Sequence, residues 1–290
     1  MKVSGFTFIR NAVKYDYPIA EAISSILPLC DEVIVSIGKS EDATEGLVRG
    51  INSPKIKIYH SVWDESMKAG GRVLATETDK AFSHVPDNTD WCIYIQGDEI
   101  IHEKYYDIIR SAMEKYKDDK SVEGFLFKYL HFYGSYDYVG DSRTWYDHEI
   151  RIIRNDKNIT AYRDAQGFRK KNQKLRVKPV DAYIYHYGWV KHPQYQLSKH
   201  LNFEQLYDSD HLRQKISREQ TKEFDYSKID SLQKFSGNHP AVMRKRIEQK
   251  NWVFDFDISK KNFNLKQRVL YWIEKKTGKR LFDYRNYKII

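Results

Sequence analysis

The chain has 290 residues, of which 41% are hydrophobic and 31% are charged, and its formal net charge is +9. This composition supports one α/β unit, or a domain of about 200 residues with an appendage, and it argues against long disordered segments. The longest apolar runs are far shorter than the roughly 20 residues of a membrane-spanning helix, and Arg10 with Asn11 interrupts the first of them, so we expect neither a membrane span nor a signal peptide. We therefore expect a cytoplasmic protein in which Cys30 and Cys92 are buried thiols.

In the first hundred residues, apolar patterns of strand length alternate with apolar patterns of helical period. The expected strands are residues 3–9, 33–37, 55–60 and 91–95, and the expected helices are residues 19–27, 44–51 and 73–85. Strands that alternate with helices are typical of a mostly parallel, doubly wound (Rossmann-like) central sheet with helices on both faces. The sequence therefore predicts the α/β class.

After residue 103 the pattern changes. A helix is expected at residues 103–116, separate strands at 124–132, 149–154 and 181–187, and later helices most clearly at 241–249 and 265–276. We expect residues 1–190 to form one domain, with a nucleotide-binding half at 1–103 and an acceptor half at 104–190. Because no linker rich in Gly, Pro or Ser follows, residues 191–290 are expected to form a mainly helical C-terminal extension packed on that domain.

Three polar clusters follow expected strands: Arg10 with Asn11, the turn at residues 38–44, and Asp98 with Glu99. Because open α/β sheets bind ligands beyond the carboxyl ends of their strands, we expect these clusters to converge at one edge of the sheet. Two carboxylates there can hold a hard divalent cation, Mg²⁺ or Mn²⁺, and diphosphate oxygens would complete its coordination. The alternative interpretation of Asp98 and Glu99 is an acidic turn exposed to solvent.

Five short motifs also occur in a fixed order along the chain. They are Phe8-Ile9-Arg10-Asn11, Ser40-Glu41-Asp42-Ala43-Thr44, Trp63 with Arg72, Asp90-Trp91-Cys92-Ile93-Tyr94-Ile95-Gln96-Gly97-Asp98-Glu99, and Tyr185-His186-Tyr187-Gly188-Trp189. In this order, across residues 3–190, they resemble the family 2 glycosyltransferases with the GT-A fold. The chain departs from that family at two points: Gln96 replaces the first aspartate of the Asp-x-Asp motif, and residues 37–39 lack the aspartate that reads the base.

The resemblance implies roles for side chains at the expected sheet edge. The candidates for nucleotide binding are Phe8, Arg10, Asn11, Lys39, Asp42, Arg72, Gln96, Gly97 and Asp98. Asp98 would be the principal ligand of the cation and His186 a further one, with Glu99 as an additional candidate. An imidazole ligand suits Mn²⁺ better than Mg²⁺. Without the resemblance, His186 is interpreted as a hydrogen-bonded core histidine and Arg72 as half of a surface salt bridge.

Transfer with inversion needs a carboxylate that takes the proton of the acceptor hydroxyl. The middle segment offers Asp147, Glu149 and Asp164, of which one is expected to be the base. Asp164 opens a segment that resembles the acceptor loop of the family, so we prefer it, although each of the three can also be a structural acid.

The resemblance implies a hexosyltransferase-type enzyme that moves a sugar from a nucleoside-diphosphate sugar to a glycan or lipid-linked acceptor. Inversion, help from a divalent cation and a setting in bacterial surface-polysaccharide or lipopolysaccharide synthesis follow from the same resemblance. Two alternatives stay open. Gln96 suggests a catalytically degenerate member, and a sugar nucleotidyltransferase would share the sheet and acidic site, although residues 3–15 lack its glycine-rich loop.

The positive charge is concentrated near the C-terminus. The basic residues there are Lys260, Lys261, Lys266, Arg268, Lys275, Lys276, Lys279 and Arg280. They indicate either a solvated helix face or peripheral contact of the C-terminal helices with an anionic membrane. A nucleic-acid-binding protein is the non-enzymatic alternative, but the basic residues do not interleave with aromatic residues that could stack on bases, so we expect no nucleic-acid partner.

Overall fold

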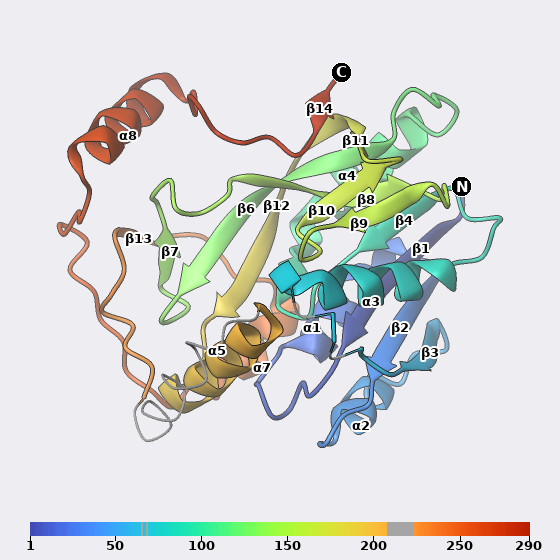
Figure 1. Ribbon diagram of the computed structural model, residues 1–290, viewed down its shortest axis with the longest axis horizontal. Coiled ribbons are helices and arrows are strands. Elements are labelled where there is room, and N and C mark those ends of the chain that lie inside the picture. The colour runs from blue at the N-terminus through green and yellow to red at the C-terminus, as the bar shows by residue number, and fades with distance from the viewer. Residues whose placement is uncertain (65, 68, 208–222) are drawn as a thin grey trace.

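The computed structural model describes residues 1–64, 66–67, 69–207 and 223–290 (Figure 1). Its main sheet begins with four parallel strands, β1 (Val3–Ile9), β2 (Glu32–Gly38), β3 (Ile56–Ser61) and β4 (Trp91–Tyr94), which lie in the order β4-β1-β2-β3. These are the four strands that the apolar runs predict. In β1, β2 and β4, buried residues lie on both faces because helices cover both, whereas the edge strand β3 carries partly buried and exposed residues.

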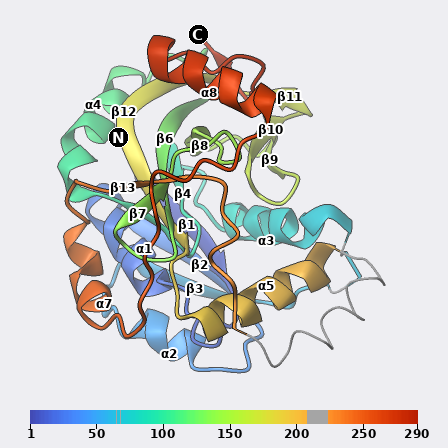
Figure 2. The same cartoon turned by 90° about the vertical axis from the view of Figure 1, so that its left-hand side faces the viewer.

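Helices lie on both sides of these strands, as predicted. In β2, Val33 and Val35 face the core cluster that contains α1 (Ile19–Ile26), whereas Ile34 faces the cluster that contains α3 (Arg72–Ser83). Figure 2 shows α1 and α4 on one side of the strands and α3 on the other. The expected α/β class with a doubly wound parallel region is therefore confirmed, and α2 (Thr44–Arg49) follows β2 where a short helix was expected.

The middle of the chain extends the sheet with long strands. After α4 (Tyr106–Lys115), β6 (Gly124–Tyr133) and β8 (His148–Arg154) form an antiparallel pair, and β8 also lies antiparallel to β4. The strand expected at residues 181–187 is part of the longer β12 (Arg176–Trp189), which lies parallel to β6.

Several short strands were not expected from the sequence. β5 (Glu99–Ile101) pairs with β12, β7 (Tyr138–Gly140) pairs with β6, and a small separate sheet contains β9 (Ile159–Tyr162), β10 (Gly167–Lys170) and β11 (Gln173–Lys174). They are two to four residues long, too short for a period-2 pattern to distinguish them from turns.

After residue 190 the chain wraps around this body. The elements there are α5 (Pro193–Tyr207), β13 (Leu232–Lys234), α7 (Arg244–Glu248), α8 (Leu265–Thr277) and β14 (Lys288–Ile289). Strand β13 pairs with β7 and β14 pairs with β12, so the extension also adds to the main sheet. The helices expected at 241–249 and 265–276 are present, whereas residues 208–222 of the expected extension lie outside the described residues.

Two findings bear on the expectations from composition. Cys30 and Cys92 are both free and buried, as predicted. None of the helices in the described residues combines the length and the apolar character that crossing a bilayer requires.

Candidate active site

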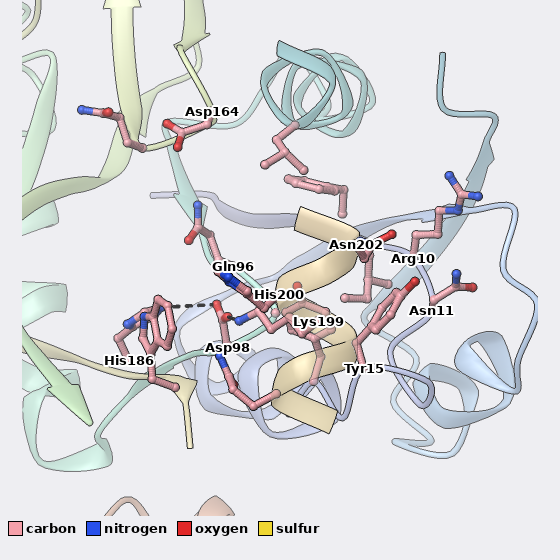
Figure 3. Close-up of a pocket in the computed structure, with 18 of the residues that line it drawn as sticks. Arg10, Asn11, Tyr15, Gln96, Asp98, Asp164, His186, Lys199, His200 and Asn202 are labelled. Carbon is pink, nitrogen blue, oxygen red and sulfur yellow. Dashed lines mark hydrogen bonds and ion pairs between the residues drawn. The ribbon is translucent and has the colours of Figure 1, made fainter. Parts of the chain in front are cut away.

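A cavity of about 380 Å³ lies where β1 and β4 end, and the chain after each strand forms part of its wall. Because β1 and β4 are parallel neighbours, Phe6 opposite Tyr94, the residues that follow them meet at one edge. The opposite wall comes from α5 and from the turn between β9 and β10 (Figure 3). The residues of the wall are Phe8, Ile9, Arg10, Asn11, Tyr15, Tyr17, Trp63, Leu74, Gln96, Gly97, Asp98, Tyr146, Asp164, Gln166, His186, Trp189, Gln196, Lys199, His200 and Asn202. Arg10, Asn11 and Asp98, from two of the three polar clusters expected to converge here, line the cavity, whereas no residue of the turn at residues 38–44 does.

Asp98 is the acidic centre of the wall and is only 7% exposed. Its Oδ2 accepts a hydrogen bond of 2.8 Å from Lys199 Nζ, and its Oδ1 lies 3.8 Å from His186 Nε2. Burial alone would raise the pKa of Asp98, but the positive charge of Lys199 outweighs burial and holds that pKa well below its usual range. Asp98 is therefore an anion at neutral pH, buried but open to the cavity.

The orientation of His186 follows from a chain of hydrogen bonds behind it. His131 Nε2 lies 2.8 Å from the carbonyl oxygen of Tyr146, which can only accept, so His131 carries its proton on Nε2. Burial lowers the pKa of both imidazoles, and in a neutral ring the other nitrogen is an acceptor. His131 Nδ1 therefore accepts, at 3.0 Å, from His186 Nδ1. The lone pair of His186 is left on Nε2, the nitrogen that faces Asp98.

This pair fits a divalent cation by the chemistry of its donor atoms. A carboxylate oxygen and an imidazole lone pair face each other, and the ring is fixed from behind by a second hydrogen bond, as is usual for metal-binding histidines. A Cβ at Gly188 would lie 2.6 Å from His186 Nε2 and 2.9 Å from Asp98 Oδ2, so glycine keeps this side open. The described residues contain no group of three His, Cys, Asp or Glu side chains suited to a metal, so Asp98 and His186 are a two-ligand set that a ligand's oxygens and water would complete.

Glu99 does not belong to this set. Asp98 lies in the turn before β5 and lines the cavity, whereas Glu99 is the first residue of β5 and is fully buried. Arg151 donates to both of its carboxylate oxygens at 2.7 Å, and the Tyr129 hydroxyl donates to Oε1 at 2.8 Å. The expectation that Glu99 is an additional cation ligand is therefore not supported by its surroundings, and we assign this carboxylate to the core.

The pair of Glu99 and Arg151 gives a prediction for stability. Arg151→Met leaves a carboxylate buried without its partner, so we expect the free energy of unfolding to fall by about 3 kcal/mol. Chemical denaturation followed by circular dichroism measures this. Arg49→Met is the control, because Arg49 pairs with Glu45 on the protein surface, where solvent screens the pair, and its loss is expected to have little effect on stability. Equal losses in the two variants would contradict the assignment of Glu99 to a buried ion pair.

At the far end of the cavity, aromatic and polar side chains from the end of β1 and from the loop after β3 lie close together. Trp63 lies against Phe8, with ring centroids 5.7 Å apart, and the guanidinium of Arg10 is 5.5 Å from the Trp63 ring. A Cβ at Gly38 would lie 2.4 Å from Trp63 Nε1, so glycine is required where the indole crosses the end of β2. Asn11 has a φ of 55°, which Asn tolerates, and its side-chain oxygen accepts from the backbone N–H of residue 41 at 2.8 Å. These contacts place two aromatic rings, tilted by 59° to each other, beside hydrogen-bonding groups.

Of the nine residues expected to bind the nucleotide, six line the cavity. They are Phe8, Arg10, Asn11, Gln96, Gly97 and Asp98. The other three lie outside the wall. Lys39 and Arg72 are exposed, the latter because the next residues of α3, Val73 and Leu74, form the buried face of the helix. Asp42 instead accepts hydrogen bonds from the backbone N–H groups of Lys14 and Thr44, which ties two loops together.

Of the three candidate bases, only Asp164 lies in the wall. It sits in the turn between β9 and β10, flanked by Arg163 and Ala165 with φ of 56° and 64°. Asp147 is 3.1 Å from His148 Nδ1 and is not part of the wall. Glu149 is buried away from the cavity, and burial raises its pKa to about 8, so its carboxyl is largely protonated at neutral pH.

Gln96 makes a contact that an aspartate could not. Its side-chain Nε2 donates to the carbonyl oxygen of Ala165 at 3.2 Å. A carboxylate has no donor for this bond, so the departure from Asp-x-Asp connects the end of β4 to the turn that carries Asp164.

The residues that sequence reasoning missed come mostly from α5. Gln196, Lys199, His200 and Asn202 all line the cavity. The helix carries polar residues around its circumference instead of one continuous apolar stripe, so its sequence does not indicate which of its faces is buried. No spacing in the sequence connects it to Asp98, a hundred residues earlier.

The chain matches no family model, and no curated protein sequence matches it. Solved structures that align with this chain include S. aureus TarS, with 15% sequence identity and a TM-score of 0.41 over 70% of this chain and 39% of that chain. Residues 1–349 of S. aureus TarS in complex with UDP align with 14% identity and a TM-score of 0.39 over 75% of this chain and 70% of that chain. Glucosyl-3-phosphoglycerate synthase from Mycobacterium tuberculosis, in complex with Mn²⁺, UDP and phosphoglyceric acid, aligns with 18% identity and a TM-score of 0.30 over 46% and 43%. The match covers 39% of that TarS chain, so this chain spans about two-fifths of its length.

Proposed function

We propose that this protein is a nucleotide-sugar-dependent glycosyltransferase whose donor site is the cavity at the ends of β1 and β4. The observation that carries the proposal is the surroundings of Asp98, where one buried carboxylate meets an imidazole lone pair and a lysine ammonium at the wall of the cavity. Such a group of charges matches a diphosphate and its counter-ion, and the aromatic end of the cavity matches a nucleoside.

In the proposed arrangement the base and ribose lie near Phe8 and Trp63, and the diphosphate lies at Asp98. Asp98 and His186 would hold Mn²⁺ or Mg²⁺, which when bound stabilises the negative charge of the departing nucleoside diphosphate. The acceptor enters from the side of the turn between β9 and β10. The acceptor oxygen then bonds to the anomeric carbon, the bond from that carbon to the diphosphate breaks, and Asp164 takes the hydroxyl proton.

The finer parts of the proposal rest on the sequence motifs. These finer parts concern the reaction, namely inversion at the anomeric carbon, transfer of a hexose, and a glycan or lipid-linked acceptor. They also include membership of family 2 and a cytoplasmic setting in bacterial surface-polysaccharide or lipopolysaccharide synthesis. The division into a nucleotide-binding half at residues 1–103 and an acceptor half at 104–190 belongs here too. Asp98 lies in the first half and Asp164 in the second, which fits that division.

A thermal-shift screen tests the proposed function. We expect one nucleoside diphosphate among UDP, GDP, CDP and ADP to raise the melting temperature selectively, and more so with Mn²⁺ than with EDTA. Saturating ligand at about 100 times its dissociation constant stabilises the folded state by about 2.7 kcal/mol, which is a shift of a few degrees for a chain of this size. No shift with any of the four nucleotides, with or without Mn²⁺, would contradict the proposal.

We also propose that α8 mediates peripheral contact with an anionic membrane. Leu265, Val269 and Trp272 are spaced to lie on one face of α8 and are 79%, 50% and 62% exposed. The exposed basic residues around them are Lys266, Arg268, Lys275, Lys276 and Lys279. In Figure 1, α8 lies at the periphery, away from the helices that cover the parallel strands. An exposed apolar face bordered by lysine and arginine matches the acyl and phosphate layers of an anionic bilayer.

Trp272→Glu tests this contact. It places an anion in the apolar face, so we expect binding to vesicles rich in phosphatidylglycerol, measured by co-sedimentation, to weaken by about ten-fold or more. Ile108→Glu is the matched control, because Ile108 is 40% exposed on α4 and should not face the membrane. Vesicle binding that is absent in the unmodified protein, or equal in the two variants, would contradict the role of α8.

A further inference from the structure

Lys199 enters the candidate site from α5, outside the segment that carries the sequence motifs. Its side chain is only 12% exposed, and its Nζ donates to Asp98 Oδ2 at 2.8 Å and to the carbonyl oxygen of Gly188 at 2.9 Å. The ammonium also lies 4.8 Å from the ring centre of Tyr17. Figure 3 shows the side chain reaching from the helix toward Asp98. The position of this charge is therefore fixed by three neighbours.

A diphosphate at the end of the cavity where Asp98 lies requires a basic side chain beside it. The two basic residues expected to contact the diphosphate, Lys39 and Arg72, are exposed and outside the wall. Among the lining residues that the structure describes, the lysine and arginine side chains are Arg10 and Lys199. Arg10 lies beside Trp63 at the aromatic end, so Lys199 is the basic side chain at the acidic end.

The geometry of the ammonium leaves it able to bind a ligand. A lysine ammonium has three N–H donors, and the two protein acceptors named above use two of them. Because Lys199 is part of the cavity wall, its third donor can reach an oxygen of a molecule in the cavity. Lys199 contacts Oδ2 of Asp98, and Oδ1 stays available for the divalent cation proposed to bind between Asp98 and His186.

We propose that Lys199 binds the diphosphate of the donor, so that α5 in the C-terminal extension completes a site whose other parts lie in residues 1–190. This inference rests on the proposed function and adds to it a phosphate-binding residue. A charge-assisted hydrogen bond to a phosphate oxygen is among the stronger polar contacts a protein makes, and the Lys199 side chain that would donate it is largely buried. The alternative is a purely structural ion pair between Lys199 and Asp98, which would leave the affinity for phosphate groups unaffected.

The experiment compares the affinity for a nucleoside diphosphate with that for the corresponding monophosphate. Isothermal titration is done with the unmodified protein, Lys199→Met and Lys199→Gln, in Mn²⁺ and in EDTA, using the base that the thermal-shift screen selects. Lys199→Gln keeps a hydrogen-bond donor but removes the charge, and serves where the methionine variant is unstable. Lys128→Met is the matched control, since Lys128 also pairs with an aspartate, Asp181 at 2.7 Å, but lies outside the cavity.

We expect both Lys199 variants to bind the diphosphate about ten-fold more weakly, with a much smaller change for the monophosphate, and the control to bind as the unmodified protein does. A Lys199 variant that folds and keeps the full preference for diphosphate over monophosphate would overturn this inference and leave the proposed function standing. An unmodified protein that binds no nucleoside diphosphate in either buffer would overturn the proposed function, and the inference with it.

Discussion

Asp98→Asn is expected to lower turnover of a nucleotide-sugar donor by about 10³-fold, the equivalent of about 4 kcal/mol, while the protein still folds. The substitution keeps the size of the side chain but removes the negative charge that Lys199 and His186 face. Neither the ammonium nor a divalent cation then has its anionic partner, so the charge on the departing diphosphate is less stabilised. Single-turnover kinetics with the donor selected by ligand binding measure the effect.

Asp141→Asn is the matched control for this change. Asp141 is also a largely buried aspartate bonded to a lysine, Lys261 at 2.9 Å, but it lies outside the cavity. We expect this control to lose some stability and to keep its turnover within about two-fold, because it has no contact with the reacting groups. Full turnover in Asp98→Asn would contradict the proposed role of this carboxylate, and an equal loss in both variants would show a general effect on folding.

Asp164→Asn is expected to lower turnover by about 10²- to 10⁴-fold and to leave the affinity for the nucleoside diphosphate unchanged. An amide cannot take the proton of the acceptor hydroxyl, whereas the contacts of the donor at Asp98 remain. The expected result is therefore a loss in the rate constant without a loss in donor binding, measured by initial rates and by isothermal titration on the same preparation.

Asp147 and Glu149, the two other candidate bases, are the controls for the loss of turnover in Asp164→Asn. Asp147→Asn and Glu149→Gln should each retain most of their turnover, because neither side chain lies in the wall of the cavity. If Asp147→Asn proves the more severe of the aspartate variants, the assignment of the base to Asp164 is contradicted.

Much of the parallel half of the fold was predictable from local patterns. The runs at β1, β2 and β4 are apolar on both faces and end at polar residues, and this combination indicates both a buried parallel strand and the edge where a ligand binds. Arg10, Asn11 and Asp98 were found in this way, and each lines the cavity.

The remainder depended on contacts between distant parts of the chain. Glu99 follows Asp98 directly, and only the pairing of β5 with β12 and the position of Arg151 show that its carboxylate is turned into the core. Lys199 lies in a helix with no motif, and its role appears only when α5 is seen against the end of β4. Local periodicity carries no information about which helix faces which strand end, so neither feature could be predicted.

The measurement that tests the proposed function most directly is a crystal structure with Mn²⁺ and the selected nucleoside diphosphate. The account predicts an anomalous manganese signal in contact with Asp98 and His186, a diphosphate that also contacts Lys199, and a base near Trp63. A nucleotide bound elsewhere on the protein, with the edge formed by β1 and β4 still empty at saturating ligand, would contradict it.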